Sequence, residues 1–292
     1  MPELPEVEIT ARLLDGALKG ARVESALAPG INALKTFAPP LSALEGQEVL
    51  GVSRRGKKFV LGFSGELMLL VHLMSAGRLQ LYDKRAGPRD RTSRVLLRVR
   101  DADDGGGDAG GAERELRLRE FGSKQAAWVK LLAAGELEQD ESIAGLGPEA
   151  WPDTPELGGL LDVPRPLHAL LRDQHTIAGI GRSWVDEILW EARLSPYKRG
   201  ADLDEAELAT LRGAVAATLG GALESYEQTV ALPIPDKLPM PLRVHRHEGE
   251  PCPRCGTKLE AVHFEDYVIA YCPTCQTEGK VLKDRRLSRL LR

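Results

Sequence analysis

Four cysteines confine the C-terminal part of this chain to a small set of folds. Two Cys-x-x-Cys pairs, Cys252 to Cys255 and Cys272 to Cys275, are separated by 16 residues, and the chain has no other cysteine. This spacing is typical of a zinc ribbon, in which each pair offers two thiolates to one tetrahedral ion. Two disulfides or unrelated thiols are the alternatives, but we find no secretory signal, and disulfides are rare in the cytosol. Because four thiolates close the coordination shell, we expect one structural zinc ion rather than a catalytic one.

Zinc binding also explains how so short a segment can fold. The part that begins at Leu242 is too small for a core of its own, and zinc contributes roughly 10–16 kcal/mol in small fingers. His263 lies between the two pairs and is expected to be a surface or packing residue. Basic residues follow the second pair, namely Lys280, Lys283, Arg285, Arg286, Arg289 and Arg292. They fit phosphate contacts, whereas the leucines among them fit a basic amphipathic helix that docks on the protein.

Length and charge set wider limits. A chain of 292 residues is long enough for two domains with cores of their own. The net charge of −4 does not suggest a nucleic-acid ligand, but a polyanion responds to local patches such as Arg54–Lys58. The longest apolar run, Leu67–Met74, is interrupted by His72 and is far too short to cross a membrane. We therefore expect a cytoplasmic protein with no membrane partner.

The first eight residues, Met1-Pro-Glu-Leu-Pro-Glu-Val-Glu8, carry a second constraint. If Met1 is removed, the chain begins with the secondary amine of Pro2, and Glu3 places a carboxylate beside it. A terminal amine has a reference pKa of about 7.7–8.0, against about 10.4 for lysine, so it is the more available nucleophile near neutral pH. The alternative is a plain helix start, because acidic Glu6 suits the positive end of a helix dipole.

Hydrophobic periodicity divides the chain into three parts and predicts an α+β protein. Residues 1–130 alternate apolar and polar positions, which predicts a mostly β domain that carries one N-terminal helix. Residues 131–241 are helical and broken by prolines, and residues 242–292 hold the cysteines. The expected strands are 22–27, 48–54, 57–63, 67–73, 79–82, 93–99, 115–119 and 126–129. The expected helices after the first are 167–173, 183–193 and 205–224, and the acidic, glycine-rich stretch 101–112 is an expected loop.

The middle one of these helices has the clearest pattern. Its apolar face is formed by Val185, Ile188, Leu189 and Ala192. Ser183 with Asp186 fits a capping pair at its start. We expect Asp186 and Glu187 to be structural rather than catalytic.

Four motifs occur in one order: Pro2–Glu8, Arg54-Arg-Gly-Lys57, Gly179-Ile-Gly-Arg-Ser183 before a helix, and the four-cysteine ribbon. Together they resemble the formamidopyrimidine-DNA glycosylase and endonuclease VIII family of base-excision repair enzymes. His72-Leu-Met74 and Leu146-Gly-Pro-Glu149 resemble further landmarks of that family. The resemblance covers essentially the whole chain, and the N-terminal motif and the ordered set are its most specific parts.

This resemblance implies a fold and a reaction. Members have an N-terminal β-sandwich domain with an N-terminal helix, and a C-terminal helical domain with a helix–two-turn–helix motif and a zinc ribbon. They act as monomers in the cytoplasm, at the nucleoid, on double-stranded DNA that carries oxidised bases or abasic sites. The damaged nucleotide is flipped out of the stack. By the family's mechanism the Pro2 amine then attacks C1′ of the deoxyribose and forms a Schiff base, and elimination cuts the strand.

The resemblance also assigns roles to single residues. Glu3 matches the family carboxylate that donates a proton during opening of the sugar ring. Lys57 matches the family lysine that contacts phosphate and helps β-elimination, and strand alternation is expected to turn Lys58 to the opposite face. The turn at Gly181 and Arg182 matches one that presents backbone N–H groups to a DNA phosphate at a helix start. A surface lysine and a simple glycine turn are the alternative interpretations.

Further DNA contacts are implied where the flipped nucleotide leaves a gap in the duplex. Members fill that gap with an apolar wedge and an arginine. Here Met74 and Phe121 are the expected fillers, Arg119 is the expected partner of the orphaned base, and His72 is an expected DNA-binding neighbour. The family's usual Asp-Pro-Arg-Arg-Phe-Gly loop is replaced by Arg119-Glu-Phe-Gly122.

Three other positions depart from the family pattern. Arg182 stands where members often have asparagine. Tyr267 stands five residues before the third cysteine, where the finger usually carries an arginine that clamps phosphate. Arg254, Arg285 or Arg286 could take that role. The segment 229–243 is short and proline-rich, whereas 8-oxoguanine-specific relatives have a longer loop over the extruded base; oxidised pyrimidines or abasic sites are therefore credible substrates.

Three classes of function remain to be compared. The first is a bifunctional DNA glycosylase and AP lyase. The second is a catalytically weak protein on the same scaffold that binds abasic or distorted DNA. The third is a zinc-ribbon protein of the transcription or translation machinery, which leaves the N-terminus unexplained. The trio Pro2, Glu3 and Lys57 favours the enzyme, because binding alone does not require it.

Overall fold

The computed structural model describes residues 2–87, 90–102, 111–121, 125–264 and 267–282. The chain forms two compact units. The first consists of Met1–Gly145 and Tyr226–Pro239, and the second of Leu146–Ser225 and Met240–Arg292. The expected boundary after residue 130 falls inside a strand of the first unit. Among the described residues, none of the helices combines the length and the apolar character that a bilayer crossing requires.

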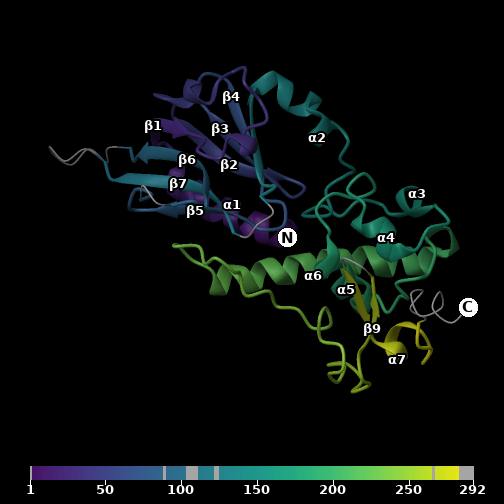
Figure 1. Ribbon diagram of the computed structural model, residues 1–292. Coiled ribbons are helices and arrows are strands. Elements are labelled where there is room, and N and C mark those ends of the chain that lie inside the picture. Colours follow the sequence, from purple (N-terminus) through teal and green to yellow (C-terminus); the bar gives the residue numbers. More distant parts are fainter. Residues whose placement is uncertain (1, 88–89, 103–110, 122–124, 265–266, 283–292) are drawn as a thin grey trace, which may run out of the picture. The chain divides into compact units, whose positions relative to one another are not determined.

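Two antiparallel sheets make up most of the first unit (Figure 1). One has the strand order β1-β6-β7-β5, and the other has the order β2-β3-β4-β8. The strands are Arg22–Leu27 (β1), Val49–Arg55 (β2), Lys58–Phe63 (β3), Leu67–His72 (β4), Gly77–Tyr82 (β5), Ser93–Arg100 (β6), Glu113–Glu120 (β7) and Trp128–Ala133 (β8). Alternation predicts the first seven to within two residues at each end. The helical periodicity expected from Leu131 is wrong there, because β8 pairs with β4 as far as Ala133.

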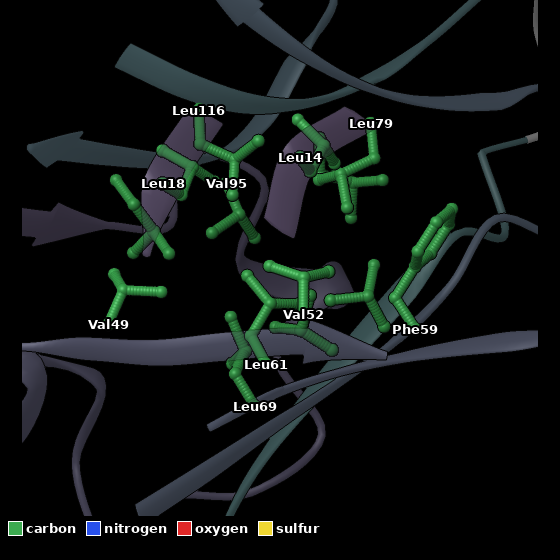
Figure 2. Close-up of a cluster of buried hydrophobic side chains, with 14 of the residues drawn as sticks. Leu14, Leu18, Val49, Val52, Phe59, Leu61, Leu69, Leu79, Val95 and Leu116 are labelled. Atoms are coloured by element: carbon green, nitrogen blue, oxygen red, sulfur yellow. The ribbon is translucent and has the colours of Figure 1, made fainter. Parts of the chain in front are cut away.

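Helix α1 (Leu4–Leu18) closes the core of the first unit. Its buried apolar positions recur at helical spacing, namely Leu4, Val7, Ala11, Leu14 and Leu18. Figure 2 shows Leu14 and Leu18 packed with Val52 of one sheet and Leu116 of the other, and all four belong to a single apolar cluster. Full burial of each such leucine contributes about 1.5–3 kcal/mol. The carboxylate of Asp15 also accepts the backbone N–H of Val52 at 2.7 Å, which fixes α1 on β2.

Short helical turns and one returning segment complete the first unit. The turns are Ile31–Ala33 (η1), Leu41–Leu44 (η2), Ala134–Gln139 (η3) and Glu141–Ala144 (α2). The proline-rich segment 230–239 lies beside β5, because Gln80 Nε2 donates to the carbonyl of Ile234 at 2.7 Å. Most of the acidic stretch 101–112 lies outside the described residues.

The second unit is helical with a small finger (Figure 1). Its elements are Gly158–Leu161 (α3), Leu167–Arg172 (α4), Arg182–Glu191 (α5), Gly200–Asp202 (η4), Glu205–Thr229 (α6), Glu260–His263 (β9), Val268–Tyr271 (β10) and Pro273–Gln276 (α7). Helix α6 extends beyond this unit, since its residues from Tyr226 on belong to the first. The predicted apolar face of α5 is confirmed as buried. The predicted Ser183 cap is wrong: Gly181 is the N-cap, and Ser183 lies inside the first turn.

Candidate active site and DNA-binding surface

The head of α1 fixes the two residues expected to carry the chemistry. Glu3 is the N-cap, and α1 begins at Leu4, so the helix-start interpretation of the N-terminus is confirmed. The backbone N–H of Glu3 donates to Oε2 of Glu6 at 2.8 Å. Glu3 is only 2% exposed, whereas Pro2 is half-buried. The local fold therefore orients Glu3 and leaves Pro2 directly before it at the start of the described chain.

A residue with no local sequence signal joins this group. The hydroxyl of Tyr226, at the end of α6, donates to Oε1 of Glu6 at 2.7 Å. Tyr226 is fully buried. Its partner lies 220 residues away in the sequence, and the predicted helix 205–224 ends before it, so no motif points to it.

The basic residues at the turn between β2 and β3 are largely buried and do not form an exposed surface patch. Gly56 adopts a positive φ of 55° at this turn, and Lys57 precedes the first residue of β3. Lys57 is 6% exposed and Lys58 is 9% exposed. The alternation argument, which turned Lys58 away, does not apply because Lys57 lies in the turn and not in the strand. Arg54 is held by an ion pair of 2.8 Å between its Nε and Oε2 of Glu8.

His72 connects this turn to the end of β4. It pairs with Lys58 across the sheet, and its ring stacks on Trp128 with centroids 5.5 Å apart. Burial, followed by the charges of Lys58 and Lys57, lowers the pKa of His72 to about 4. The ring is therefore neutral at pH 7, and its Nδ1 accepts the backbone N–H of Met74 at 3.1 Å. This bond holds Met74 in a left-handed conformation, with φ of 49°.

Arg119 and Phe121 lie together at the end of β7. The guanidinium of Arg119 is 4.7 Å from the centroid of the Phe121 ring. Arg119 also donates to the hydroxyl of Tyr82 at 2.6 Å and to Oγ1 of Thr92 at 3.1 Å. These bonds hold the arginine in place before any ligand arrives. Gly122, the last residue of the expected helix-filling loop, lies outside the described residues.

The turn before α5 and the finger share an aromatic cluster in the second unit. Tyr267 stacks on Phe264 with centroids 4.4 Å apart. Two guanidinium groups lie over the Tyr267 ring, that of Arg172 at 4.2 Å and that of Arg182 at 5.3 Å from its centroid. Gly181 is buried as the N-cap, and Arg182 is exposed. The tyrosine that replaces the finger arginine is therefore accompanied by two arginines from α4 and α5.

The four cysteines form one cluster of metal-ligand spacing. All four sulfur atoms lie within 4.8 Å of one another, and none forms a disulfide. Cys255 Sγ is 3.5 Å from both Cys272 Sγ and Cys275 Sγ. Zn–S bonds of about 2.3 Å in a tetrahedron give S···S separations of about 3.8 Å, so the donor set fits one zinc ion. With four thiolates the shell is closed, and such an ion would hold the finger folded.

Two buried carboxylates of α5 attach the finger to the helices. Glu187 accepts the backbone N–H groups of Arg243, Val244 and His245 at 2.9–3.0 Å. Asp186 accepts the backbone N–H of Ala270 at 2.9 Å. Both carboxylates are almost fully buried. Besides these backbone groups, Asp186 lies 2.7 Å from Nδ1 of His245 and 3.3 Å from Nε2 of His168, and Glu187 lies 3.7 Å from Nε of Arg243. These contacts fit the structural role that the sequence predicts.

Comparison with known proteins shows family matches in three successive parts of the chain. The family model of the formamidopyrimidine-DNA glycosylase N-terminal domain matches residues 1–122. The model of the formamidopyrimidine-DNA glycosylase H2TH domain matches residues 158–233. The model of a zinc finger found in FPG and IleRS matches residues 249–277.

Individual relatives match over similar spans. A formamidopyrimidine-DNA glycosylase of Pediococcus pentosaceus is 30% identical and covers 94% of this chain and 99% of its own. One of Moorella thermoacetica is 34% identical and covers 90% and 94%. A solved complex between the Lactococcus lactis Fpg and DNA with an abasic site is 25% identical, with a TM-score of 0.81 over 94% of this chain and 99% of that one. From these matches, this chain belongs to the formamidopyrimidine-DNA glycosylase and endonuclease VIII family.

Proposed function

We propose that this protein is a bifunctional DNA glycosylase and AP lyase that removes oxidised bases from double-stranded DNA and then cuts the strand. The relatives are named DNA glycosylases, and the solved relative holds DNA with an abasic site, which supports glycosylase activity in DNA repair. One observation carries the catalytic part of the proposal. Glu3 is buried at the N-cap of α1 with its N–H fixed by Glu6, directly after Pro2.

The proposed first step forms a covalent bond to the sugar. After removal of Met1, the lone pair of the Pro2 nitrogen attacks C1′ of the flipped nucleotide. The new N–C1′ bond replaces the bond from C1′ to the base, and the base leaves with that electron pair. The proton that the nitrogen sheds after attack neutralises the departing base. Nucleophilic catalysis of this kind divides one difficult displacement into two easier steps.

The second step opens the sugar and cuts the strand. Glu3 donates a proton to O4′ as the C1′–O4′ bond breaks, and the nitrogen lone pair forms the C1′=N⁺ bond of a Schiff base. Loss of a proton from C2′ gives an enamine, whose electrons expel the 3′ phosphate. Lys57 binds a phosphate beside the sugar and assists this elimination. Water finally hydrolyses the Schiff base and frees Pro2.

Contacts to DNA are assigned to both units. His72 and Met74 in the turn after β4, with Arg119 and Phe121 after β7, are proposed to contact the lesion strand and its gap. In the second unit, backbone N–H groups after Gly181 face a phosphate at the positive end of α5. Arg182, with Arg172 beside it over Tyr267, supplies cations that the finger itself lacks at position 267.

Substrate preference follows from the segment after α6. Only a short proline-rich stretch connects Thr229 to Arg243, and Gln80 ties its middle to β5. A segment held in this way has little length left to cover an extruded purine. We propose oxidised pyrimidines and abasic sites as the main substrates.

Borohydride trapping tests the proposed chemistry. Purified protein is incubated with duplexes that contain an abasic site, dihydrouracil or 8-oxoguanine, and borohydride then reduces any Schiff base to a stable adduct. We expect a covalent protein–DNA adduct, and mass spectrometry should locate the attached DNA on the N-terminal peptide. It should disappear when the N-terminus is extended, because an acylated Pro2 has no nucleophilic lone pair. DNA binding without an adduct on any lesion would instead support the catalytically weak binding protein.

Strand cleavage of the same duplexes, measured without borohydride, separates the two buried lysines. Lys57→Ala is expected to slow strand cleavage by about a hundredfold, the usual loss when one acid–base or charge-stabilising group is removed. Lys58→Ala should keep the activity, and Lys19→Ala, at an exposed position of the same unit, is the matched control. A loss only in Lys58→Ala would move the assignment to that lysine.

A further inference from the structure

Tyr226 is a buried residue for which the proposed reaction has no role yet. It lies in the last turn of α6 and has no exposed surface. Its hydroxyl donates to Oε1 of Glu6 at 2.7 Å, and Oε2 of the same carboxylate accepts the N–H of Glu3 at 2.8 Å. Tyr226 is therefore joined through one carboxylate to the peptide group between Pro2 and Glu3.

The phenol end of this chain of hydrogen bonds stays protonated. Burial, then the charge of Glu6 and its hydrogen bond, and then the charge of Glu3, raise the pKa of Tyr226 far above its usual value. The phenol therefore stays a donor throughout the physiological pH range. Because both oxygens of Glu6 accept hydrogen bonds, the group has the pattern of a carboxylate. A buried carboxylate is costly unless donors surround it, so the phenol is part of what stabilises that charge.

We propose that Tyr226 is a positioning residue for the nucleophile, acting through Glu6 on the Pro2–Glu3 peptide group. This role rests on the proposed function. Glu6 can hold that peptide group in one orientation only while its own carboxylate is held, and the phenol holds the other oxygen. The same hydrogen bond offsets part of the negative charge that Glu6 places near Pro2. Loss of the phenol therefore changes both the direction of the Pro2 nitrogen and the charge around it.

Several other charged groups on α1, β2 and α6 form ion pairs with one another. Arg12 of α1 bridges Glu8 and, at the end of α6, Glu227. Arg54 of β2 pairs with Glu8 from the other side. Glu3 is a further acidic neighbour, and its charge acts on Tyr226. Glu227 therefore provides a matched control. It follows Tyr226 in the sequence and also contacts α1, but its partner there is Arg12 rather than Glu6.

Single-turnover trapping on abasic DNA tests the proposal. Tyr226→Phe keeps the ring and removes the hydroxyl; we expect adduct formation to slow by about tenfold or more at neutral pH, with the DNA Kd within about twofold of wild type. Glu6→Gln should also be slower. The double variant should be no slower than Glu6→Gln alone, because a residue that acts through Glu6 has nothing left to act on. Glu227→Gln should form the adduct at the wild-type rate.

The pH profile gives a readout that a merely structural role would not move. In Tyr226→Phe the charge of Glu6 is less offset, which favours the protonated Pro2 amine, so the midpoint of the rate profile should move to higher pH. In Glu6→Gln the charge is absent, so the midpoint should move to lower pH. Thermal unfolding of each variant confirms that the fold is intact, and Glu6→Gln keeps the test available if Tyr226→Phe does not fold.

The outcomes separate this inference from the function on which it rests. An adduct with wild type, together with an unchanged rate and profile in Tyr226→Phe, overturns the positioning role alone. Additive losses in the double variant, or a loss that only follows weaker DNA binding, also overturn it. No adduct with wild-type protein overturns the proposed function, and the positioning role with it.

Discussion

At the scale of single residues, His72 has the environment that most clearly predicts a measurable effect. Its pKa is lowered from 6.5 to about 4 by burial and by the charges of Lys58 and Lys57. In the unfolded chain it titrates near its usual value of about 6.5. Between these two values the unfolded state binds more protons than the native state. The native state therefore loses stability as the pH falls from about 6.5 towards about 4, by up to about 3 kcal/mol.

Replacing His72 with glutamine isolates this effect, because glutamine keeps a polar side chain but does not titrate. Urea unfolding of both proteins at about pH 7 and at about pH 4.5 measures the two free energies of unfolding. The wild-type protein should lose more stability between these pH values than His72→Gln does. The other histidines are common to both proteins and cancel. Equal losses would mean that His72 is protonated as easily in the fold as in water.

The residue scale also shows what a sequence can and cannot indicate about the site. Pro2 and Glu3 lie in one short stretch whose order carries the signal, and their place at a helix start is confirmed. Tyr226 carries no such signal, because its partner is distant in the chain and the contact exists only once α6 is packed. Lys57 and Lys58 cannot be told apart by alternation, since only the fold shows where the turn ends and β3 begins.

At the scale of elements, loop packing explains why the motif Leu146–Glu149 contains a glycine. In Leu146-Gly-Pro-Glu149, the backbone N–H of Gly147 donates to the carbonyl of Gln174 at 2.8 Å. A Cβ at Gly147 would lie 2.6 Å from the carbonyl oxygens of both His175 and Thr176. Both obstacles are backbone atoms of the turn before α5, so they cannot rotate away. Glycine is required here by close approach.

Gly147→Ala is therefore expected to destabilise the second unit by about 1–3 kcal/mol, the usual cost of overpacking. Thermal unfolding against wild type measures the loss. Gly213→Ala is the matched control, because Gly213 lies inside α6 and a Cβ added there would meet no atom within 4 Å. That variant should gain roughly 0.5–1 kcal/mol from its better helix propensity. A neutral Gly147→Ala would show that the turn can shift.

Helices and strands could be predicted where the hydrophobic period and the length of the segment indicate the same type of element. Seven strands of the sandwich follow from alternation because each buries one face on a single core. The misplaced β8 spans Trp128–Ala133, where only Lys130 interrupts the apolar residues, and a short, mostly apolar segment fits a strand or a helix equally well. The cap of α5 fails for a different reason. Ser183 has the right residue type, but the helix starts earlier, at Arg182, with Gly181 as its N-cap.

At the scale of the whole molecule, the division of the chain differs from a simple succession of domains. The segment Tyr226–Pro239 belongs to the first unit, although most of α6 belongs to the second. Gln80 with Ile234 and Glu6 with Tyr226 connect residues more than 150 positions apart. Local patterns contain no information about such contacts. The sequence therefore indicates the order of the parts but not the return of this segment to the sandwich.

The stability of the finger is expected to depend on zinc bound to its four cysteines. Two of the four cysteines, Cys252 and Cys272, belong to the same buried cluster as Trp190 of α5. The indole N–H of Trp190 also donates to Cys252 Sγ at 3.4 Å. The hairpin of β9 and β10 has only four residues in each strand, which is too short to be stable alone. Zinc therefore supports both the finger and its attachment to α5.

Removal of zinc by a chelator is expected to unfold the finger and leave the first unit folded, since the core of that unit contains no cysteine. Hydrogen exchange followed by mass spectrometry measures both parts in one sample. Peptides of β9 and β10 should lose protection while those of β3 and β4 keep it, and added zinc should restore the former. DNA affinity should fall with the finger, because Tyr267 would no longer support Arg172 and Arg182. If released zinc were detected while β9 and β10 stayed protected, the finger would be held by its contacts with α5 rather than by the metal.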